Sequence, residues 1–329
     1  MNHINPALTR IRNKLPNIEI LVAEPMKNHT SFRIGGCVQA VISPKETQEV
    51  ITLCQILQEY NIKPLIIGNG TNLLVDDCAL DLIVIKTTYL NEMTKLSDNK
   101  IIAGSGTLLS KLAVFACEND MTGLEFAHGI PGTLGGAVTM NAGAYGGEMK
   151  DVIRVTTAYC PKNGIYTIKD SEHDFSHRKS RFSELEPNSV KTRDPYSPHR
   201  AWALCQRFNE VIISSEVELS KGSKEEIKSL MGEFSKKRRE SQPLDIPSAG
   251  SVFKRPKEGY AAAMIEQAGL KGYTVGEAQV SEKHSGFIVN MGSAKFSDVI
   301  AVMEHVKETV FAQFGVELEP EIKIIRGEL

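Results

Sequence analysis

The chain contains 329 residues with a formal net charge of −2 at pH 7, and 24% of its residues are charged. This length is enough for two or three domains that each bury a core. The near-neutral charge, without a basic run interleaved with aromatic residues, argues against nucleic acid and anionic membranes as partners. We expect a cytoplasmic protein, because the first residues lack a signal-like apolar core and no apolar run reaches ~18 residues.

The first predicted lobe covers residues 1–87 and mixes helix with strand. Its pattern begins as strand, helix, strand. The tetrapeptide SPKE at 43–46 has the form of a capping box with proline at the first helical position, which predicts a helix from there to about Asn61. Further strands are expected at 63–67 and 82–86, which gives an α+β lobe.

Two short glycine loops follow isoleucine-rich runs, GNGTNLL at 68–74 and GSGTLL at 104–109. Neither is a dinucleotide-binding fingerprint, because leucine stands at the sixth position. The dipeptide Gly-Lys occurs nowhere in the chain, which excludes a P-loop. We interpret both segments as copies of one motif, a strand followed by a glycine loop. The motif would bind a nucleotide in a fold other than these two.

The densest glycine segment is 129–147, where seven glycines occur in 19 residues with no charged side chain. Glycine at this density is typical of backbone that takes positive φ or lies close to a ligand. Exposed backbone amides can bind a pyrophosphate without a lysine. The alternative is a set of tight turns in a β-rich domain.

The second predicted lobe, 88–220, is rich in strand, with alternating patterns at 152–159 and 211–219. A third lobe is expected over 221–315. It opens with a capping box at 223–226 and an amphipathic helix to about Glu240.

Two more helices are predicted in the third lobe, one over 260–268 that stops at Gly269 and one from Ser297 as cap to Gly315. The basic run at 236–239 is interpreted as the solvated end of a helix. A separate C-terminal unit, 316–329, is expected to hold a final strand over 316–325.

The cysteine pattern predicts no metal site and no disulfide framework. Six cysteines lie at least 17 residues apart, and HExxH is absent although His173 and His177 are four apart. In a cytosolic chain, scattered cysteines are usually reduced and partly buried.

Six motifs, in order, resemble the UDP-N-acetylenolpyruvoylglucosamine reductase (MurB) family, in its shorter type II subclass. They are NHTSFRIGG at 28–36, GNGTNLLV at 68–75, EFAHGIPGTLGGAVTMNAGAYGG at 125–147, RKSRF at 178–182, AGSVFKRP at 249–256 and LEPEIK at 318–323. The resemblance runs nearly end to end. It implies a three-lobed α+β FAD-binding fold of the vanillyl-alcohol oxidase/PCMH type, with a C-terminal substrate-binding domain.

The resemblance implies noncovalent FAD across the first two lobes, rather than attachment through His29 or Cys37. The cofactor-binding residues that it implies are Arg33, Gly68, Asn69, Gly70, Thr71, Asn72, Leu73, Gly129, Ile130, Pro131, Gly132, Thr133, Gly136, Ala137, Asn141, Gly143 and Ala144.

The implied reaction is reduction of an enolpyruvyl ether of a UDP-sugar by NADPH through FAD, which yields UDP-N-acetylmuramate for peptidoglycan and hence for cell shape and division. Arg178 would hold the substrate carboxylate beside the developing enolate. Ser251 would protonate the adjacent carbon, and Glu321 would act as acid or polariser. Which of the two delivers the final proton stays open. Glu319 is the rival of Glu321, two residues away and on the same face if the segment is a strand.

Substrate binding is assigned by resemblance to Lys254, Lys283, His284 and Asn290; for His284 a purely structural role stays open. Two features depart from the family pattern. His177 replaces a tyrosine, which puts a phenol contact in doubt, and the segment 183–209 is longer than expected. This loop could cover the active site, contact another subunit or be disordered.

Two other functions compete with the reductase. One is an FAD-dependent oxidase or dehydrogenase of a different small molecule. The other is an inactive flavin or nucleotide-sugar sensor, against which the presence of Arg178, Ser251 and Glu321 argues. Oligomeric state and the preference for NADPH over NADH are not predicted.

Overall fold

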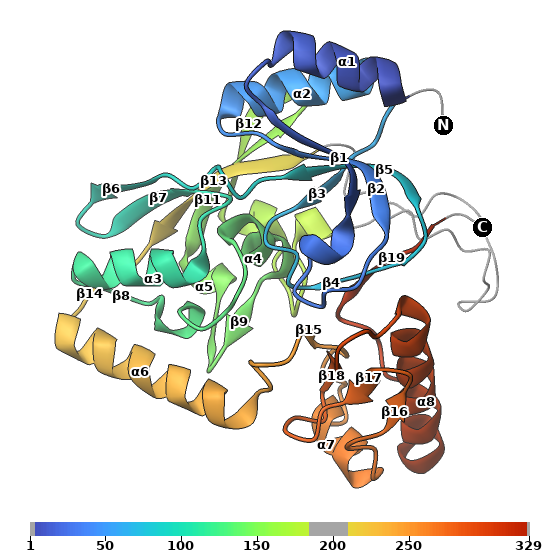
Figure 1. Ribbon diagram of the computed structural model, residues 1–329. Helices are drawn as coiled ribbons and strands as arrows, with labels where there is room; N and C mark the ends of the chain where they lie inside the picture. Colours follow the sequence, from blue (N-terminus) through green and yellow to red (C-terminus); the bar gives the residue numbers. More distant parts are fainter. Residues whose placement is uncertain (1–3, 184–209, 328–329) are drawn as a thin grey trace.

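The computed structural model describes residues 4–183 and 210–327, which form three lobes around a common centre (Figure 1). The expected long loop at 183–209 lies outside the described residues except for its first position. In the described ranges, no helix combines the length and the apolar character needed to span a bilayer.

The first lobe is a four-stranded sheet in the order β1-β2-β5-β3, with α1 and α2 together on one side (Figure 1). Strands β2, β5 and β3 are parallel, and β1 is antiparallel to β2. Its elements are α1 (Ile4–Lys14), β1 (Glu19–Pro25), β2 (Cys37–Ser43), α2 (Thr47–Glu59), β3 (Leu65–Ile67), β4 (Leu73–Val75) and β5 (Leu80–Lys86), with a short 3-10 turn η1 (Met26–Asn28).

The predicted strand, helix, strand order of this lobe is confirmed, but the helix begins later than the capping box. Helix α2 starts at Thr47 with Glu46 as its N-cap. Ser43 cannot cap it, because Ser43 is the buried last residue of β2 and pairs with Glu19. The apolar face of the helix, with Leu53 and Leu57 fully buried, is as expected.

The second lobe is a five-stranded antiparallel sheet in the order β12-β11-β13-β7-β6. Its strands and helices are β6 (Met93–Ser97), β7 (Lys100–Gly104), α3 (Leu109–Glu118), β8 (Met121–Thr122), α4 (Leu134–Met140), β9 (Gly143–Ala144), β10 (Gly147–Glu148), α5 (Met149–Val152), β11 (Ile153–Cys160), β12 (Gly164–Lys169), β13 (Val211–Glu218) and β14 (Ser220–Lys221); its 3-10 turns are η2 (Glu125–Ala127), η3 (Asp170–His173) and η4 (Arg181–Ser183).

Helix α6 (Lys224–Ser241) packs on this second lobe, beside α3 and η2 (Figure 1). Its apolar residues Ile227 and Met231 belong to the same buried core as the five-stranded sheet. The predicted cap is present, since Ser223 accepts a hydrogen bond from the amide of Glu226 at 3.5 Å. The packing therefore does not change at the expected boundary, residue 221.

The third lobe is an antiparallel sheet in the order β15-β18-β17-β16 with two helices. Its elements are β15 (Ser248–Ser251), α7 (Ala261–Gln267), β16 (Thr274–Val275), β17 (Ala278–Val280), β18 (Phe287–Asn290) and α8 (Phe296–Phe314). The predicted stop at Gly315, with φ of +69°, is confirmed. The expected cap is wrong, because Ser297 lies inside α8 and Lys295 is the N-cap.

The chain end is shorter in strand than expected. Only β19 (Lys323–Ile325) is regular, and it pairs in parallel with β4 of the first lobe. Residues 316–322 do not form the predicted strand, since Pro320 makes only an isolated bridge with Phe253 and has no amide hydrogen for a ladder. The C-terminal segment therefore crosses from the third lobe back to the first.

Asp77 links the first lobe to α8, since its Oδ2 accepts a hydrogen bond of 2.6 Å from the amide of Phe296, the first residue of the helix. We expect Asp77→Ala to lower the free energy of unfolding by about 1 kcal/mol, the usual cost of losing a helix cap. Urea denaturation followed by circular dichroism measures this. Asp98→Ala, at a solvated turn, is the control and should change stability by less than ~0.5 kcal/mol. Equal effects of the two substitutions would contradict the linking role.

Candidate active site

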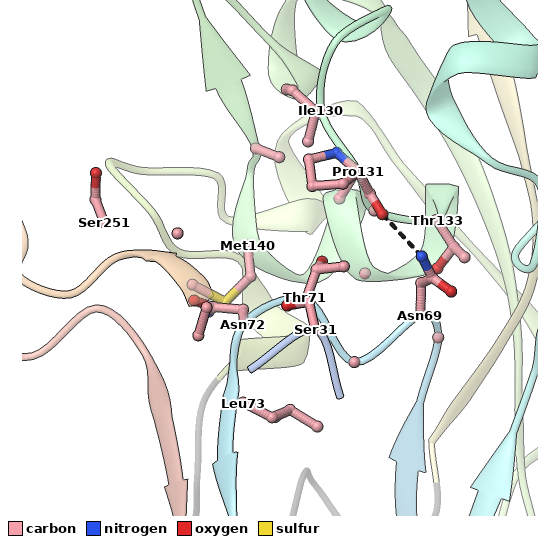
Figure 2. Close-up of a pocket in the computed structure, with 18 of the residues that line it drawn as sticks. Ser31, Asn69, Thr71, Asn72, Leu73, Ile130, Pro131, Thr133, Met140 and Ser251 are labelled. Carbon is pink, nitrogen blue, oxygen red and sulfur yellow. Dashed lines mark hydrogen bonds between the residues drawn. The ribbon is translucent and has the colours of Figure 1, made fainter. Parts of the chain in front are cut away.

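A cavity of about 1110 Å³ lies where the three lobes meet. Its walls come from the glycine loops of the first two lobes, the 176–183 segment, the end of α6, β15 and the segment around Glu321. Figure 2 shows Ser251 at one end of the labelled lining residues and Asn69 with Thr133 at the other. The volume exceeds the roughly 300–1,000 Å³ of common small-molecule sites, so it suits a large ligand or two ligands together.

Loops 68–73 and 129–137 form a cradle in this cavity. The Nδ2 of Asn69 donates a hydrogen bond of 3.0 Å to the carbonyl of Pro131 (Figure 2). Gly70 has a φ of +61°, and a Cβ there would overlap the carbonyl oxygen of His29. At Gly68 a Cβ would overlap the hydroxyl of Thr133. Gly68 thus permits the two loops to approach each other, and Gly70 permits the first loop to approach His29.

The cradle presents donors that the described protein does not use. Within residues 4–183 and 210–327, the amides of Asn69, Thr71 and Thr133 donate to no protein acceptor. The hydroxyls of Ser105 and Thr133 line the cavity, are almost fully buried and have no partner. Orphaned buried donors of this kind fit the oxygens of a diphosphate.

The loop at 104–109 contributes less to the cavity than the other two glycine loops. Only Ser105 of it reaches the cavity. The amides of Gly104 and Gly106 already donate to the carbonyls of Glu92 and Leu90. A Cβ at either glycine would overlap backbone of residues 87–91, so these glycines permit two segments to cross closely. This loop therefore offers the cavity the side chain of Ser105 but neither of its glycine amides.

The three predicted catalytic residues meet in the cavity. Arg178, Ser251 and Glu321 all line it. The amide of Glu321 donates to the carbonyl of Val252 at 2.7 Å, which places Glu321 beside Ser251. The Nε of Arg178 lies 2.9 Å from Oε1 of Glu321. The two side chains form an ion pair, but the orientation of the Nε–H does not make it a hydrogen bond.

Arg178 sits on a two-residue turn. Ser176 and Lys179 exchange backbone hydrogen bonds, and Arg178 has a φ of +55°. Two hydrogen bonds tie this turn to α4. Asn141 Nδ2 donates to the Ser176 carbonyl at 3.0 Å, and Ser180 Oγ donates to the Thr139 carbonyl at 2.8 Å.

Asn141 therefore differs from its predicted role. It does not line the cavity, because it is fully buried and its amide group also bonds Glu148 and the Lys150 amide. Its side chain holds the arginine turn through the Ser176 carbonyl. The other predicted cofactor residues, from Arg33 to Ala144, all line the cavity.

Burial raises the pKa of Glu321 and outweighs the opposing attraction of Arg178, Lys254 and Lys323. Its rival Glu319 differs in environment, since the Glu319 side chain is 72% exposed and pairs with Lys254 at 3.0 Å. The two glutamates do not share a strand face, because residues 316–322 are not a strand. Glu321 alone of the pair faces the cavity.

Among the predicted substrate residues, only His284 lines the cavity. Its Nδ1 accepts a hydrogen bond from the Gly286 amide, so Nε2 carries the proton, and burial lowers its pKa. Lys254 pairs with Glu319 outside the cavity lining. Lys283 donates from Nζ to the carbonyl of Arg239.

Asn290, another predicted substrate residue, does not line the cavity either. It is buried, its Nδ2 donates to the Phe32 carbonyl at 3.1 Å, and its Oδ1 accepts from the amides of Gly292 and Ala294. It joins the first lobe to the third. His177, in place of the usual tyrosine, does not line the cavity, and burial with the adjacent Arg178 lowers its pKa.

Sequence reasoning missed two basic residues of the cavity. The basic run at 236–239 is not uniformly solvated, since Arg238 is 9% exposed, lines the cavity and donates to the Gly129 carbonyl. Its Nε has no described partner. Lys323 also lines the cavity. Its spacing of two residues from Glu321 could have indicated it.

Two further expectations concern covalent attachment of the flavin and metal binding. Neither His29 nor Cys37 lines the cavity. His29 lies between Glu24 and Lys86, at 3.1 Å from each. In the ranges that the structure describes, no cluster of three or more His, Cys, Asp or Glu side chains has metal-binding geometry.

Two family models match the chain. An FAD binding domain matches residues 38–167, and the C-terminal domain of UDP-N-acetylenolpyruvoylglucosamine reductase matches residues 242–325. Proteins named UDP-N-acetylenolpyruvoylglucosamine reductase are 43% identical in Caldanaerobacter subterraneus (96% of this chain, 97% of that protein) and 42% identical in Clostridium novyi (92% and 91%). The crystal structure of the Thermus caldophilus reductase is 28% identical, with a TM-score of 0.74 over 94% of this chain and 99% of that one.

The cradle gives a test that does not depend on catalysis. Gly70→Ala forces a side chain at positive φ against the His29 carbonyl. We expect it to weaken FAD binding about tenfold or more, measured by flavin fluorescence during titration of the apoprotein. Gly232→Ala is the matched control, because its Cβ meets no atom within 4 Å in helix α6. It should leave FAD affinity unchanged, and a similar loss in both variants would contradict the cradle.

Proposed function

The chain belongs to the UDP-N-acetylenolpyruvoylglucosamine reductase family, and from this premise we propose how its cavity carries out the reaction of that family. It is an FAD-dependent oxidoreductase that reduces the enolpyruvyl group of UDP-N-acetylenolpyruvoylglucosamine with NADPH, in peptidoglycan synthesis. The expected FAD-binding fold is confirmed. The observation that supports the site assignment most strongly is the convergence of Arg178, Ser251 and Glu321 at one end of the cavity.

For the domains, we propose a division that follows the packing. The third lobe begins near residue 242, where the match to the reductase C-terminal domain starts, rather than at 221. Strand β19 belongs to the first lobe, although Glu321 just before it faces the site. UDP-sugars and NADPH are cytoplasmic metabolites, which favours a cytoplasmic location.

We assign FAD to the cradle. Asn69, Thr71 and Thr133 would donate their free amides to the diphosphate, and the hydroxyls of Ser105 and Thr133 would add two donors. When bound, FAD accepts hydride from NADPH and supplies it to the enolpyruvyl carbon. Noncovalent binding agrees with the position of His29 and Cys37 outside the lining.

Arg178 would bind the substrate carboxylate and stabilise the negative charge that develops beside it. Its planar guanidinium can bind a carboxylate through two parallel hydrogen bonds. The strained turn, held by Asn141 and Ser180, fixes where the guanidinium points. A preorganised donor of this kind contributes about 3–4 kcal/mol to catalysis.

Ser251 would give its proton to the carbon next to the carboxylate. Its hydroxyl is exposed to the cavity at the end of β15. The transfer is favourable because the acceptor is an enolate-like carbanion. The amide of Glu321 donates to the carbonyl of Val252, which places Glu321 next to Ser251. With its raised pKa, Glu321 would polarise the enolate-like part of the substrate.

The UDP portion would extend toward Arg238 and His284. Arg238 is a buried cation that, among the described residues, forms no ion pair with a carboxylate, which suits a phosphate. The Nε2–H of His284 is a fixed donor in an uncharged imidazole. Lys283 and Asn290 are left out of this assignment because their polar atoms bond to the protein.

Ser251→Ala separates the two half-reactions. The expected rate constant for reoxidation of the reduced flavin by enolpyruvyl-UDP-N-acetylglucosamine falls by about 10²–10⁴-fold, since a positioned proton donor is lost. Reduction by NADPH should stay within twofold and acts as the internal control. Anaerobic stopped-flow absorbance measures both phases. Equal slowing of the two phases would argue against Ser251 as proton donor.

Glu321 predicts a pH dependence. If its protonated form polarises the substrate, the reoxidation rate is full below its raised pKa and falls as the pH increases through that value. Glu321→Gln should remove this limb and slow reoxidation by about 10²-fold. Glu319→Gln, at the exposed neighbour, should keep both rate and limb. Single-turnover rates between pH 5 and 9 test this, and a limb that survives in Glu321→Gln excludes the role.

A further inference from the structure

Lys323 is a basic residue of the cavity to which the proposed reaction gives no role. It begins β19, lies opposite Leu73 of β4, and donates its backbone amide to the Asn72 carbonyl at 2.9 Å. Leu73 and Ile325 of the two paired strands also line the cavity. Burial lowers its pKa, with the nearby Lys254 adding to the effect and the charge of Glu321 opposing it.

The charges around Lys323 do not balance within the described residues. Arg178 pairs with Glu321, and Lys254 pairs with Glu319. No carboxylate of residues 4–183 or 210–327 lies within 4.0 Å of the Lys323 ammonium. A half-buried cation without a partner is costly unless a ligand supplies negative charge.

Four ligand groups could supply that charge, and three of them already have donors elsewhere. The UDP diphosphate has Arg238 and His284. The cofactor diphosphate has the amides and hydroxyls of the cradle around Asn69 and Thr133. The substrate carboxylate has the fork of Arg178. The remaining group is the flavin ring, which must reach the end of the cavity where Glu321 and Ser251 lie if hydride is to pass to the substrate.

We propose that the Lys323 ammonium lies against the flavin ring and stabilises the negative charge that the ring gains on reduction. The proposal rests on the proposed function. When NADPH gives a hydride, two electrons and one proton enter the ring at N5, NADP⁺ leaves, and the negative charge spreads over N1 and the C2 oxygen. A cation near that edge favours the reduced state and is one of the means by which a protein tunes a cofactor.

The test is the two-electron midpoint potential of the bound FAD, measured anaerobically against a reference dye with an enzymatic electron source, without NADPH or UDP-sugar. Lys323→Met should lower the equilibrium ratio of reduced to oxidised flavin about tenfold at a given potential, a shift of about 30 mV to more negative values. Lys323→Arg should keep the wild-type potential. Lys254→Met removes a cation that is paired with Glu319 outside the cavity lining, and it should leave the potential unchanged.

FAD affinity and the KM for the UDP-sugar decide between the alternatives. An unchanged potential with weakened FAD binding in Lys323→Met would assign the lysine to the diphosphate and overturn the proposal. An unchanged potential with a raised KM would assign it to the substrate carboxylate. Equal shifts of the potential in Lys323→Met and Lys254→Met would mean that any nearby positive charge has this effect, which would overturn a specific contact between Lys323 and the flavin ring. The midpoint potential can be measured with bound flavin alone, so it does not depend on the proposed function. If Lys323→Met shifts the potential but the UDP-sugar does not reoxidise the flavin of the wild-type protein, the proposed function is contradicted and the role of Lys323 is not.

Discussion

Three hydrogen bonds around Glu321 hold the site together. The Glu321 amide donates to Val252 of the third lobe, and its carbonyl accepts from Asn72 of the first lobe at 3.3 Å. Lys323 then donates its amide to the Asn72 carbonyl, which starts the parallel pairing of β19 with β4. One short segment therefore fixes the cofactor loop, the serine and the glutamate relative to one another.

The same segment creates the electrostatic character of the cavity. It carries one carboxylate and one ammonium into a half-buried space where the dielectric constant is lower than in water. Burial acts in opposite directions on the two groups, raising the pKa of Glu321 and lowering that of Lys323. Both shifts favour uncharged forms, and ion pairing with Arg178 opposes the shift at Glu321. A ligand that brings negative charge would oppose the shift at Lys323, because it stabilises the ammonium.

The sequence predicted features that depend on residues close together in the chain. The apolar face of α2, the stop of α8 at Gly315 and the cradle glycines follow from periodicity, positive φ and close backbone approach. The meeting of Arg178, Ser251 and Glu321 followed from family resemblance. Helix starts were less predictable, because Ser43 was already committed to a strand.

The failures concern polar side chains whose partners lie far away in the chain. Asn290 bonds to Phe32, and Asn141 bonds to Ser176, so neither amide is available to a ligand. Arg238 belongs to a basic run that looks solvated, yet the glycine loop covers it. No pattern within a short window reports such contacts, because they depend on how the lobes pack.

Helix α4 connects two functions through its length. Thr133, just before its first residue, belongs to the cradle, and Asn141, just after its last, holds the arginine turn. The eight residue steps from Thr133 to Asn141 give a fixed separation of about 12 Å between these points and a fixed rotation of about 100° per residue. Inserting or deleting one residue in α4 would leave both end sequences intact but turn one end away from the other. Evolution of this enzyme can therefore vary the side chains of α4 more freely than its residue count.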